Sequence, residues 1–511
     1  MWPPLTASPV VVVTDSSTGS SGRTVKDPSL LDAVTPLVVL AGSIAGALVM
    51  FGLDALDGPI QVALILCSMV AALIALKNGY SWSAVEDAQR RSVASLTTPI
   101  FILLSVGALI GVWNLSGTIP TIVYYGIQIL SASWYYPAAA IICGIVSMSI
   151  GSSWTTAGTI GVGLVGIALM IGVSPSITAG AVISGAYLGD KLSPLSETTV
   201  LTAQMVDVPV YEHIKRQAWT SVPAFGVAVV VFLILGLTGS TPAGQSITNT
   251  VELHKLGDIY HINVLNLLPL LLLAGLSFKK VPPTLALLAS TLFAGILAAF
   301  LQPQVMGDFV GHDADGFIGS IKGVWQAMAH GFHIDSGIPD IDRLLSRGGM
   351  DSMLPTIWLI IGAVTFGTLL EEFGLISRLI NPLIAKARTT GRLFVTVFGC
   401  AFGLNVVAGD QYIALVLPSR LFRAEFTRRR LAPANLSRLC ADSATVTSPL
   451  VPWNSCGAFM GAVLGVATLK YLPFTVFCFA SPLLSVGYGI TGLRVETLPP
   501  RTEQSSDLAP A

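Results

Sequence analysis

The sequence has little charge for its size. Only 11% of its 511 residues are Asp, Glu, Lys or Arg, whereas a typical soluble domain has about 25%. Hydrophobic residues make up 53% of the chain, and its mean hydropathy is +0.75. These values exclude an ordinary soluble domain and predict an integral membrane protein, with the lipid bilayer as its main partner. The formal net charge of −1 gives no basic surface, so we expect no nucleic-acid partner.

The sequence also lacks the usual motifs of catalysis and of metal cofactors. Its six cysteines are scattered without a Cys-x-x-Cys pair, and we expect them to be small packing residues. It has no His-Glu-x-x-His pattern and no Gly-x-Ser-x-Gly elbow. The six histidines are expected in loops or interfaces, and residues 1–29 lack the basic and apolar regions of a cleavable signal peptide. We therefore expect neither an enzyme nor a bound cofactor.

Two polar strings interrupted by proline stand inside long apolar sequence. Residues 189–199 read GDKLSPLSETT, and residues 442–454 read DSATVTSPLVPWN. Both contain Ser-Pro-Leu, several hydroxyl groups and a carboxylate. Irregular polar backbone at membrane depth is tolerated only where it is buried in protein or lines a cavity. A matched pair in the two halves of a chain indicates the binding site of a transporter.

Long apolar segments fill most of the remaining sequence. A helix needs about 20 apolar residues to cross a bilayer. The uninterrupted candidates are residues 33–53, 59–76, 96–113, 219–238, 262–278, 281–301, 353–370 and 471–493. Further apolar segments contain polar breaks, and they are residues 138–171, 177–206, 393–422 and 436–468. The sequence therefore predicts many membrane helices, some of which are broken inside the membrane.

The distribution of Lys and Arg orients these segments, because basic residues favour the cytoplasmic side. With the N-terminus inside and residues 138–171 and 393–422 as re-entrant hairpins, most of the 27 basic residues lie on that side. We therefore expect an all-α polytopic membrane protein: an inverted 5+5 transmembrane repeat with two re-entrant hairpins and two broken helices. The expected divisions are a disordered cytoplasmic N-tail (1–30), a first transmembrane repeat (31–240), a linker with the first two spans of the second repeat (241–301), an extracytoplasmic loop (302–352), the remainder of the second repeat (353–493) and a disordered cytoplasmic C-tail (494–511).

The breaks collect oxygen atoms that could bind a cation. A broken helix exposes carbonyl groups at one end and amide groups at the other, which attract cations and anions respectively. Oxygen ligands without His or Cys suit a hard cation such as sodium. The candidate ion- or substrate-binding residues are Ser152, Ser153, Thr155, Asp190, Ser193, Ser196, Glu197, Thr198, Thr199, Asn405, Asp410, Asp442, Thr447, Ser448 and Asn454. Among them, the candidate sodium ligands are Asp190, Asp410, Asp442 and Asn454.

Four carboxylates in these regions are functional candidates, because a charge inside a membrane segment is costly. Each also has a structural interpretation. Asp190 could pair with Lys191, Glu197 could be a first-turn helix charge, and Asp410 and Asp442 could be helix caps. The neighbouring hydroxyls could likewise only cap helix ends. A buried carboxylate near a cation can exchange a proton for a sodium ion, but the sequence does not show which of the four would do so.

Four motifs give the chain a family resemblance. They are residues 151–159 (GSSWTTAGT), 180–199 (GAVISGAYLGDKLSPLSETT), 409–412 (GDQY) with 417–420 (LPSR), and 442–457 (DSATVTSPLVPWNSCG). In these motifs, and over roughly residues 31–493, the chain resembles the NhaC-type sodium/proton antiporters of the ion transporter superfamily. It departs from the family pattern at Glu197, where Asp is frequent, and at Thr155, where Gly is frequent. Both departures bear on ion preference and stoichiometry.

The resemblance implies a secondary transporter of the bacterial inner membrane that exchanges sodium for protons by alternating access. It implies no cofactor beyond the transported sodium and protons. Some proteins similar to this family exchange organic acids together with these ions, so exchange of a small organic acid or amino acid stays open as an alternative. Arginine is the usual clamp for a carboxylate, and the four breaks contain none. The sequence does not distinguish a monomer from a homodimer.

Overall fold

The computed structural model describes residues 25–56, 58–238, 251–311 and 316–499. Within these ranges the chain is helical and forms no strand, apart from two isolated bridges. Nine of the described helices are long and apolar enough to cross a membrane. The predicted all-α polytopic membrane protein is therefore confirmed. The expected tails at 1–24 and 500–511, and the linker at 241–250, lie outside the described residues.

The first half of the chain supplies the helices up to residue 238. In order they are α1 (Leu30–Phe51), α2 (Pro59–Lys77), α3 (Trp82–Ser95), α4 (Thr97–Leu115), α5 (Thr118–Ile129), α6 (Tyr135–Ile150), α7 (Ser153–Thr156), the π-helical turn η3 (Ala157–Gly161), α8 (Val162–Met170), α9 (Pro175–Leu192), α10 (Glu197–Met205) and α11 (Val210–Thr238). The sequence breaks appear where they were expected, between α6 and α7 and between α9 and α10.

The second half repeats much of this order. Its helices are α12 (Val251–Ile259), α13 (Leu268–Phe278), α14 (Pro283–Leu301), α15 (Pro303–Val310), α16 (Phe317–His330), α17 (Pro339–Leu345), α18 (Leu354–Glu372), α19 (Leu375–Lys386), α20 (Thr390–Val407), α21 (Gln411–Arg428), α22 (Pro433–Cys440), the π-helical turn η7 (Ala441–Thr445), α23 (Ser455–Leu464), α24 (Thr468–Tyr471) and α25 (Val476–Thr491). Both halves thus contain a long helix, a short helix, a two-armed hairpin and a broken helix, in the same order along the chain.

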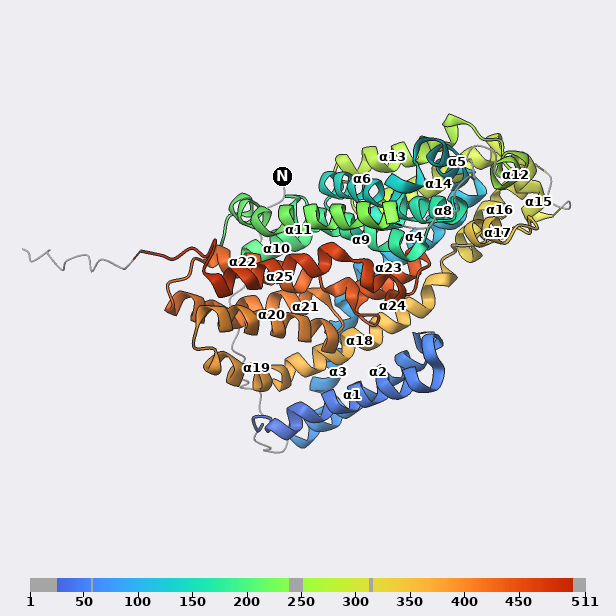
Figure 1. Cartoon of the computed structure of the whole chain (residues 1–511). Coiled ribbons are helices and arrows are strands. Elements are labelled where there is room, and N and C mark those ends of the chain that lie inside the picture. Colours follow the sequence, from blue (N-terminus) through green and yellow to red (C-terminus); the bar gives the residue numbers. More distant parts are fainter. Residues whose placement is uncertain (1–24, 57, 239–250, 312–315, 500–511) are drawn as a thin grey trace, which may run out of the picture.

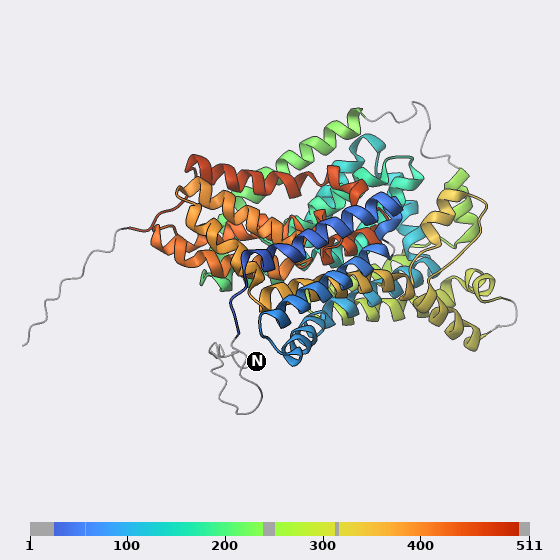
Figure 2. The same ribbon diagram turned by 90° about the horizontal axis from the view of Figure 1, so that it is seen from below.

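The helices form an elongated bundle (Figure 1). Helices α10, α19 and α22 lie toward one end, and α5, α12 and α15 to α17 lie toward the other. Helices α1 and α2 run side by side along one flank, as the view from below also shows (Figure 2). The segment 302–352 was expected as an extracytoplasmic loop, and its described residues include α15 to α17. It docks on α4, where the amide of Gly349 donates to the carbonyl of Gly107 at 2.7 Å.

Several Arg-rich loops contact one another at one end of the bundle, and we call this end the basic end. Arg91 at the end of α3 pairs with Glu372 at the end of α18. Arg429 at the end of α21 donates to the carbonyl of Ala387 after α19. Residues 494–499, expected within a disordered tail, also lie here, since the amide of Ala432 donates to the carbonyl of Glu496 at 3.0 Å.

Glycines let the chain turn at the two hairpin tips. Gly151 between α6 and α7 has φ of 80°, and Gly409 between α20 and α21 has φ of 60°. Side chains with a Cβ disfavour such positive values. The arms return beside one another, because the amide of Ser174 after α8 donates to the hydroxyl of Tyr136 at the start of α6 (2.9 Å). Three of these arms (132–150, 153–170 and 390–407) are each long enough to cross a membrane.

Candidate functional site

The two hairpin tips meet the first helix break at the wall of one cavity. Its volume is about 680 Å³. The residues of its wall that were predicted from sequence are Ser152, Ser153, Thr155, Asp190, Ser196, Glu197, Thr198 and Asp410. The wall also includes Arg91 and Lys280, which are exposed at the basic end. The cavity therefore runs from the buried Asp190 to the surface at that end.

Asp190 lies at the end of α9, and its carboxylate contacts the tip of the first hairpin. It accepts hydrogen bonds from the amide of Ser153 at 3.2 Å and from the hydroxyl of the same residue. The hydroxyl of Ser196 lies 3.5 Å from the same carboxylate. Asp190 is only 8% exposed. The carboxylate therefore caps the amide end of α7 and also faces the cavity.

The backbone carbonyl of Asp190 accepts hydrogen bonds from three hydroxyl groups of the first break. It accepts hydrogen bonds from Ser196 (2.9 Å), Thr198 (3.0 Å) and Thr199 (2.6 Å). Ser193 is buried, and its hydroxyl accepts from the amide of Leu195 at 3.3 Å. The hydroxyls of Ser196, Thr198 and Thr199 thus cap a helix end, as the structural interpretation of the sequence allowed. They donate to a carbonyl at the end of α9 that has no partner within the helix. Ser196 and Thr198 also line the cavity.

The second hairpin tip brings two more carboxylates to the cavity. Asp410 caps α21, because its side chain accepts from the amide of Ile413 at 2.9 Å. Glu197, which starts α10, accepts from the hydroxyl of Tyr412 at 2.9 Å. This bond joins the first break to the second tip across more than 200 residues of sequence. Three predicted carboxylates, those of Asp190, Glu197 and Asp410, thus line one cavity, and the wall also includes Glu371.

The second break forms a separate buried cluster around Asn405. The amide group of Asn405 donates to the carbonyl of Ala444 (2.7 Å) and to the hydroxyl of Thr447 (2.9 Å). Asn454 donates in turn to the side-chain oxygen of Asn405 at 3.1 Å and caps α23. Ser448 donates to Gln411 at 2.7 Å. Asn405, Thr447, Ser448 and Asn454 are buried and are not part of the cavity wall.

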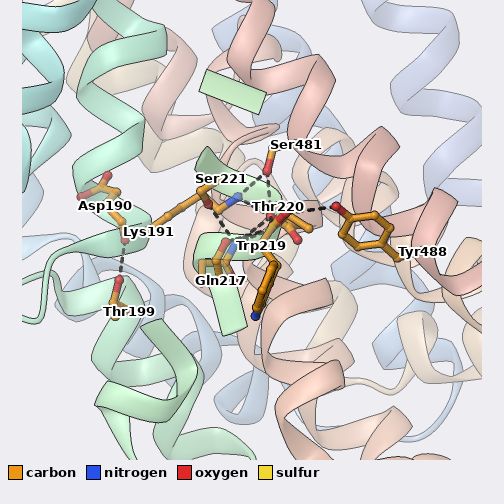
Figure 3. Close-up of polar contacts among 10 residues, drawn as sticks. Asp190, Lys191, Thr199, Gln217, Trp219, Thr220, Ser221, Ser481 and Tyr488 are labelled. Atoms are coloured by element: carbon orange, nitrogen blue, oxygen red, sulfur yellow. Dashed lines mark hydrogen bonds and ion pairs between the residues drawn. The ribbon is translucent and has the colours of Figure 1, made fainter. Parts of the chain in front are cut away.

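Asp442 occupies a third position, in a buried ion pair with Lys191. Both side chains are fully buried. The Oδ1 atom of Asp442 also accepts hydrogen bonds from Gln217 (2.7 Å), Thr220 (3.1 Å) and Ser481 (2.7 Å). The expectation that Lys191 could pair with its neighbour Asp190 is therefore wrong. The two residues point in different directions in Figure 3, because consecutive side chains on a helix diverge by about 100°.

Sequence reasoning missed several partners of this ion pair. Thr220 on α11 and Ser481 on α25 lie in segments that were treated as plain apolar spans, and Gln217 on α11 lies just before the first of these spans. His213 was expected in a loop or interface, but it is fully buried on α11, with Nδ1 3.0 Å from the hydroxyl of Ser437. The available signal was the spacing of His213, Gln217 and Thr220, which places them on one face of a helix.

The cavity is covered on the side away from the basic end. The indole of Trp154 stacks on the ring of Phe459, with centroids 4.1 Å apart and planes at 14°. Farther out, the guanidinium of Arg347, from the segment after α17, donates to the carbonyl of Val463 at 3.3 Å. The first hairpin and α23 are therefore held together between the cavity and the opposite end.

The oxygen groups of the cavity suit a hard cation better than a transition metal. The described residues include no group of three or more His, Cys, Asp or Glu side chains arranged to hold a metal ion. Carboxylate, hydroxyl and carbonyl oxygens are instead distributed over the two hairpin tips and the first break.

A family model described as the Na+/H+ antiporter family matches residues 29–207 and 185–493, which is nearly all of the described chain. The chain belongs to the Na+/H+ antiporter family. The resemblance seen in the four sequence motifs is thereby confirmed. The two matches meet in the region of the first break, which both include.

Similar curated proteins are all named as transporters. The chain is 36% identical to the Na+/H+ antiporter NhaC of Alkalihalophilus pseudofirmus, over 85% of this chain and 91% of that protein. It is 33% identical to the arginine/ornithine antiporter ArcD of Halobacterium salinarum, over 95% and 97%. It is 32% identical to the malate-2H+/Na+-lactate antiporter of Bacillus subtilis, over 92% and 96%. The family of this chain is therefore established, whereas the substrates stated in the names of its relatives differ.

Proposed function

We propose that this protein exchanges sodium for protons across the inner membrane, and that sodium binds in the cavity lined by Asp190, Glu197 and Asp410. The observation that carries this proposal is the charge of the cavity wall. Its buried part contains carboxylates and hydroxyls, while its basic residues, Arg91 and Lys280, lie at the exposed mouth. Arg91 is also paired with Glu372 at 2.9 Å. A cation is therefore favoured over an anion at the buried end.

The helix ends around the cavity support the same choice. A free helix N-terminus would attract the carboxylate of an organic acid. Each N-terminus at the tips and breaks is already capped by a side chain: α7 by Ser152, α10 by Ser196, α21 by Asp410 and α23 by Asn454. These caps leave fewer amides to bind a carboxylate, so a small cation such as sodium is the better match.

The proposed orientation places the basic end in the cytoplasm, with both termini on that side. This assignment follows from the preference of Lys and Arg for cytoplasmic loops. The cavity then faces inward, and the Trp154–Phe459 stack and Arg347 close the outward side. We propose that the two halves are inverted repeats with re-entrant hairpins, whose rearrangement opens the outward side by alternating access. The matching order of helices in the two halves supports this arrangement.

The test is exchange in proteoliposomes made with the purified protein. An imposed pH gradient should drive uptake of radioactive sodium, and an imposed sodium gradient should drive proton movement. Asp190→Asn should raise the apparent KM for sodium strongly. Asp308→Asn is the matched control, because Asp308 is an exposed carboxylate on α15, away from the cavity. The proposal fails if no sodium-dependent proton movement occurs, or if both variants behave alike.

A second candidate is sodium- or proton-coupled exchange of a small organic acid or amino acid. The size of the cavity favours it, because about 680 Å³ exceeds what a bare sodium ion occupies and lies in the range of small-molecule sites. The names of the relatives from Halobacterium salinarum and Bacillus subtilis point the same way. Adding arginine, ornithine, malate or lactate to one side of the vesicles distinguishes the two candidates. An organic solute that is required for sodium flux would support the second.

A further inference from the structure

A second group of buried polar atoms lies apart from the cavity, between α11, α22 and α25. Twelve buried side-chain nitrogen and oxygen atoms of the described residues have no hydrogen-bond partner. Nine of the twelve lie on these elements and on the turn η7 that continues α22. Two of the nine are the hydroxyls of Ser443 and Thr445, and the other seven belong to six residues. These atoms are His213 Nε2, Arg216 Nε, Gln217 Oε1, Arg438 Nε, Arg438 Nη2, Asp442 Oδ2 and Ser485 Oγ.

Helical spacing brings these residues onto facing surfaces. His213 and Gln217 are four residues apart on α11, and Arg438 and Asp442 are four apart along α22 and η7. Ser485 follows Ser481, a partner of Asp442, by one turn of α25. Residues four apart share one face of a helix, and the three helices pack against one another. The six residues therefore form one polar column.

The column leads from the basic end of the molecule to the Lys191–Asp442 pair. At the surface, Arg216 is 34% exposed and pairs with Glu496 at 2.6 Å. Deeper, Arg438 is 1% exposed and donates to the carbonyl of Arg494 at 3.1 Å. Gln217 then donates to Asp442 at 2.7 Å. Polar groups thus continue from solvent to the buried ion pair.

None of the six residues is part of the wall of the cavity that contains Asp190. The two polar routes start at the same end of the molecule and reach consecutive residues of α9. Asp190 faces the cavity, and Lys191 extends toward Gln217 and Ser481 (Figure 3). The end of α9 therefore separates an acidic route from a basic one.

Buried polar atoms without a protein partner are uncommon, because each loses its hydration on folding. Ordered water satisfies such atoms when several of them surround one site. Both donors and acceptors are present among these atoms: the guanidinium of Arg438 has unpartnered N–H groups, and Asp442 Oδ2 and Gln217 Oε1 are unpartnered acceptors. Asp442 pairs with the buried Lys191, and a second buried cation, Arg438, lies one turn before Asp442. The positive balance repels sodium but not water.

We propose that this column is a second, water-filled passage, separate from the sodium cavity, that connects the basic end with the Lys191–Asp442 pair. It carries water, and the protons that water can transfer, while its arginines exclude sodium. This role in exchange rests on the proposed function, but the presence of water in the column does not.

Cysteine accessibility tests for water independently of transport. In the full-length protein with its six native cysteines replaced, Ser485→Cys introduces a thiol in the passage. Ala228→Cys introduces one on α11, where Ala228 is fully buried in apolar contacts. The uncharged reagent methyl methanethiosulfonate should modify the first variant about tenfold faster or more, because a thiol in the dry core reacts only after local opening. Equal rates, measured by intact mass, would overturn the passage.

A filling variant tests the role of the passage in exchange. Ser485→Leu should lower the maximal exchange rate about tenfold, the loss expected when one barrier rises by about 1.4 kcal/mol, with the KM for sodium unchanged. Ser485→Ala, which removes only the hydroxyl, should fold and transport nearly normally. A full rate in a well-folded Ser485→Leu protein would overturn the role in exchange. If the unaltered protein exchanges no sodium for protons, the proposed function fails, and the reactivity of Ser485→Cys still decides whether the passage exists.

Discussion

Replacing Asp442 with Asn removes the one carboxylate that lies between two buried cations. Lys191 contacts it directly, and Arg438 lies one turn earlier on the same helix. The Asn side chain keeps a carbonyl oxygen that can accept from Gln217 and Ser481. The change therefore removes charge and leaves most of the packing intact. Removing one partner of a buried ion pair typically costs about 3–5 kcal/mol of stability, because the other charge stays in a poor environment.

Replacing Lys191 with Met should cost less than replacing Asp442. Asp442 would still have the nearby charge of Arg438 and its hydrogen bonds from Gln217, Thr220 and Ser481. Asp442→Asn instead leaves Lys191 and Arg438 together without a carboxylate. The double variant, with both Lys191→Met and Asp442→Asn, has no uncompensated lysine. Its loss of unfolding free energy should therefore be smaller than the sum of the two single losses by about 2–3 kcal/mol.

Reversible unfolding in mixed detergent micelles measures the free energy of unfolding of the unaltered protein, the two single variants and the double variant, which together form a double-mutant cycle. Arg90→Met is the matched control, since Arg90 pairs with Asp87 at 3.8 Å and the two side chains are 77% and 57% exposed. An exposed pair should contribute only about 0–1 kcal/mol. Additive costs of the Lys191 and Asp442 changes would refute the reasoning. An Asp442→Asn cost no larger than that of Arg90→Met would refute it as well.

Two further variants test the contacts around the first break. Tyr412→Phe removes the hydrogen bond to Glu197, which is worth about 1 kcal/mol, so the apparent KM for sodium should rise about fivefold in the proteoliposome assay; an unchanged KM would show that the bond does not shape the site. Gly189→Ala adds a Cβ that collides with Ser147 where α9 crosses α6, whereas Gly226 on α11 has open space. Size-exclusion profiles should therefore show loss of folded protein for Gly189→Ala but not for Gly226→Ala, and equal profiles would contradict the close packing of α6 on α9.

The sequence predicted the helix breaks well because their signals are local. Gly151 and Gly409 supply the positive φ at the tips, and proline with small polar residues ends α9 before Ser193. Ser and Asp at these places cap the following helices, as their side chains commonly do. Most of the long apolar helices also follow from length and hydropathy, but the candidates at 262–278 and 471–493 form the shorter helices Val264–Phe278 and Val476–Thr491. How the arms cross the membrane depends instead on tertiary packing, which local patterns do not encode.

The candidate site was predicted only in part, because sequence proximity does not give side-chain direction. Asp190 and Asp410 line the cavity, as a common site required, but Asp442 and Asn454 are bonded elsewhere. The alternative in which Lys191 pairs with its neighbour Asp190 is wrong, because the Lys191 side chain leaves α9 on another face and pairs with Asp442. Whether Asp442 or Asn454 binds sodium in another conformation stays a prediction.

The adjacency of Asp190 and Lys191 suggests how the two routes are coupled. A cation that binds near Asp190 changes the hydrogen bonds that its carboxylate makes to Ser153. Because Lys191 is the next residue on the same rigid helix end, displacement of Asp190 also displaces the ammonium group that contacts Asp442 and Ser481. Buried ion pairs depend steeply on distance in a medium of low polarity. If sodium binds near Asp190 as proposed, we expect its binding to change the energy of the Lys191–Asp442 pair, and by linkage a change in that pair should alter the affinity for sodium by the same factor.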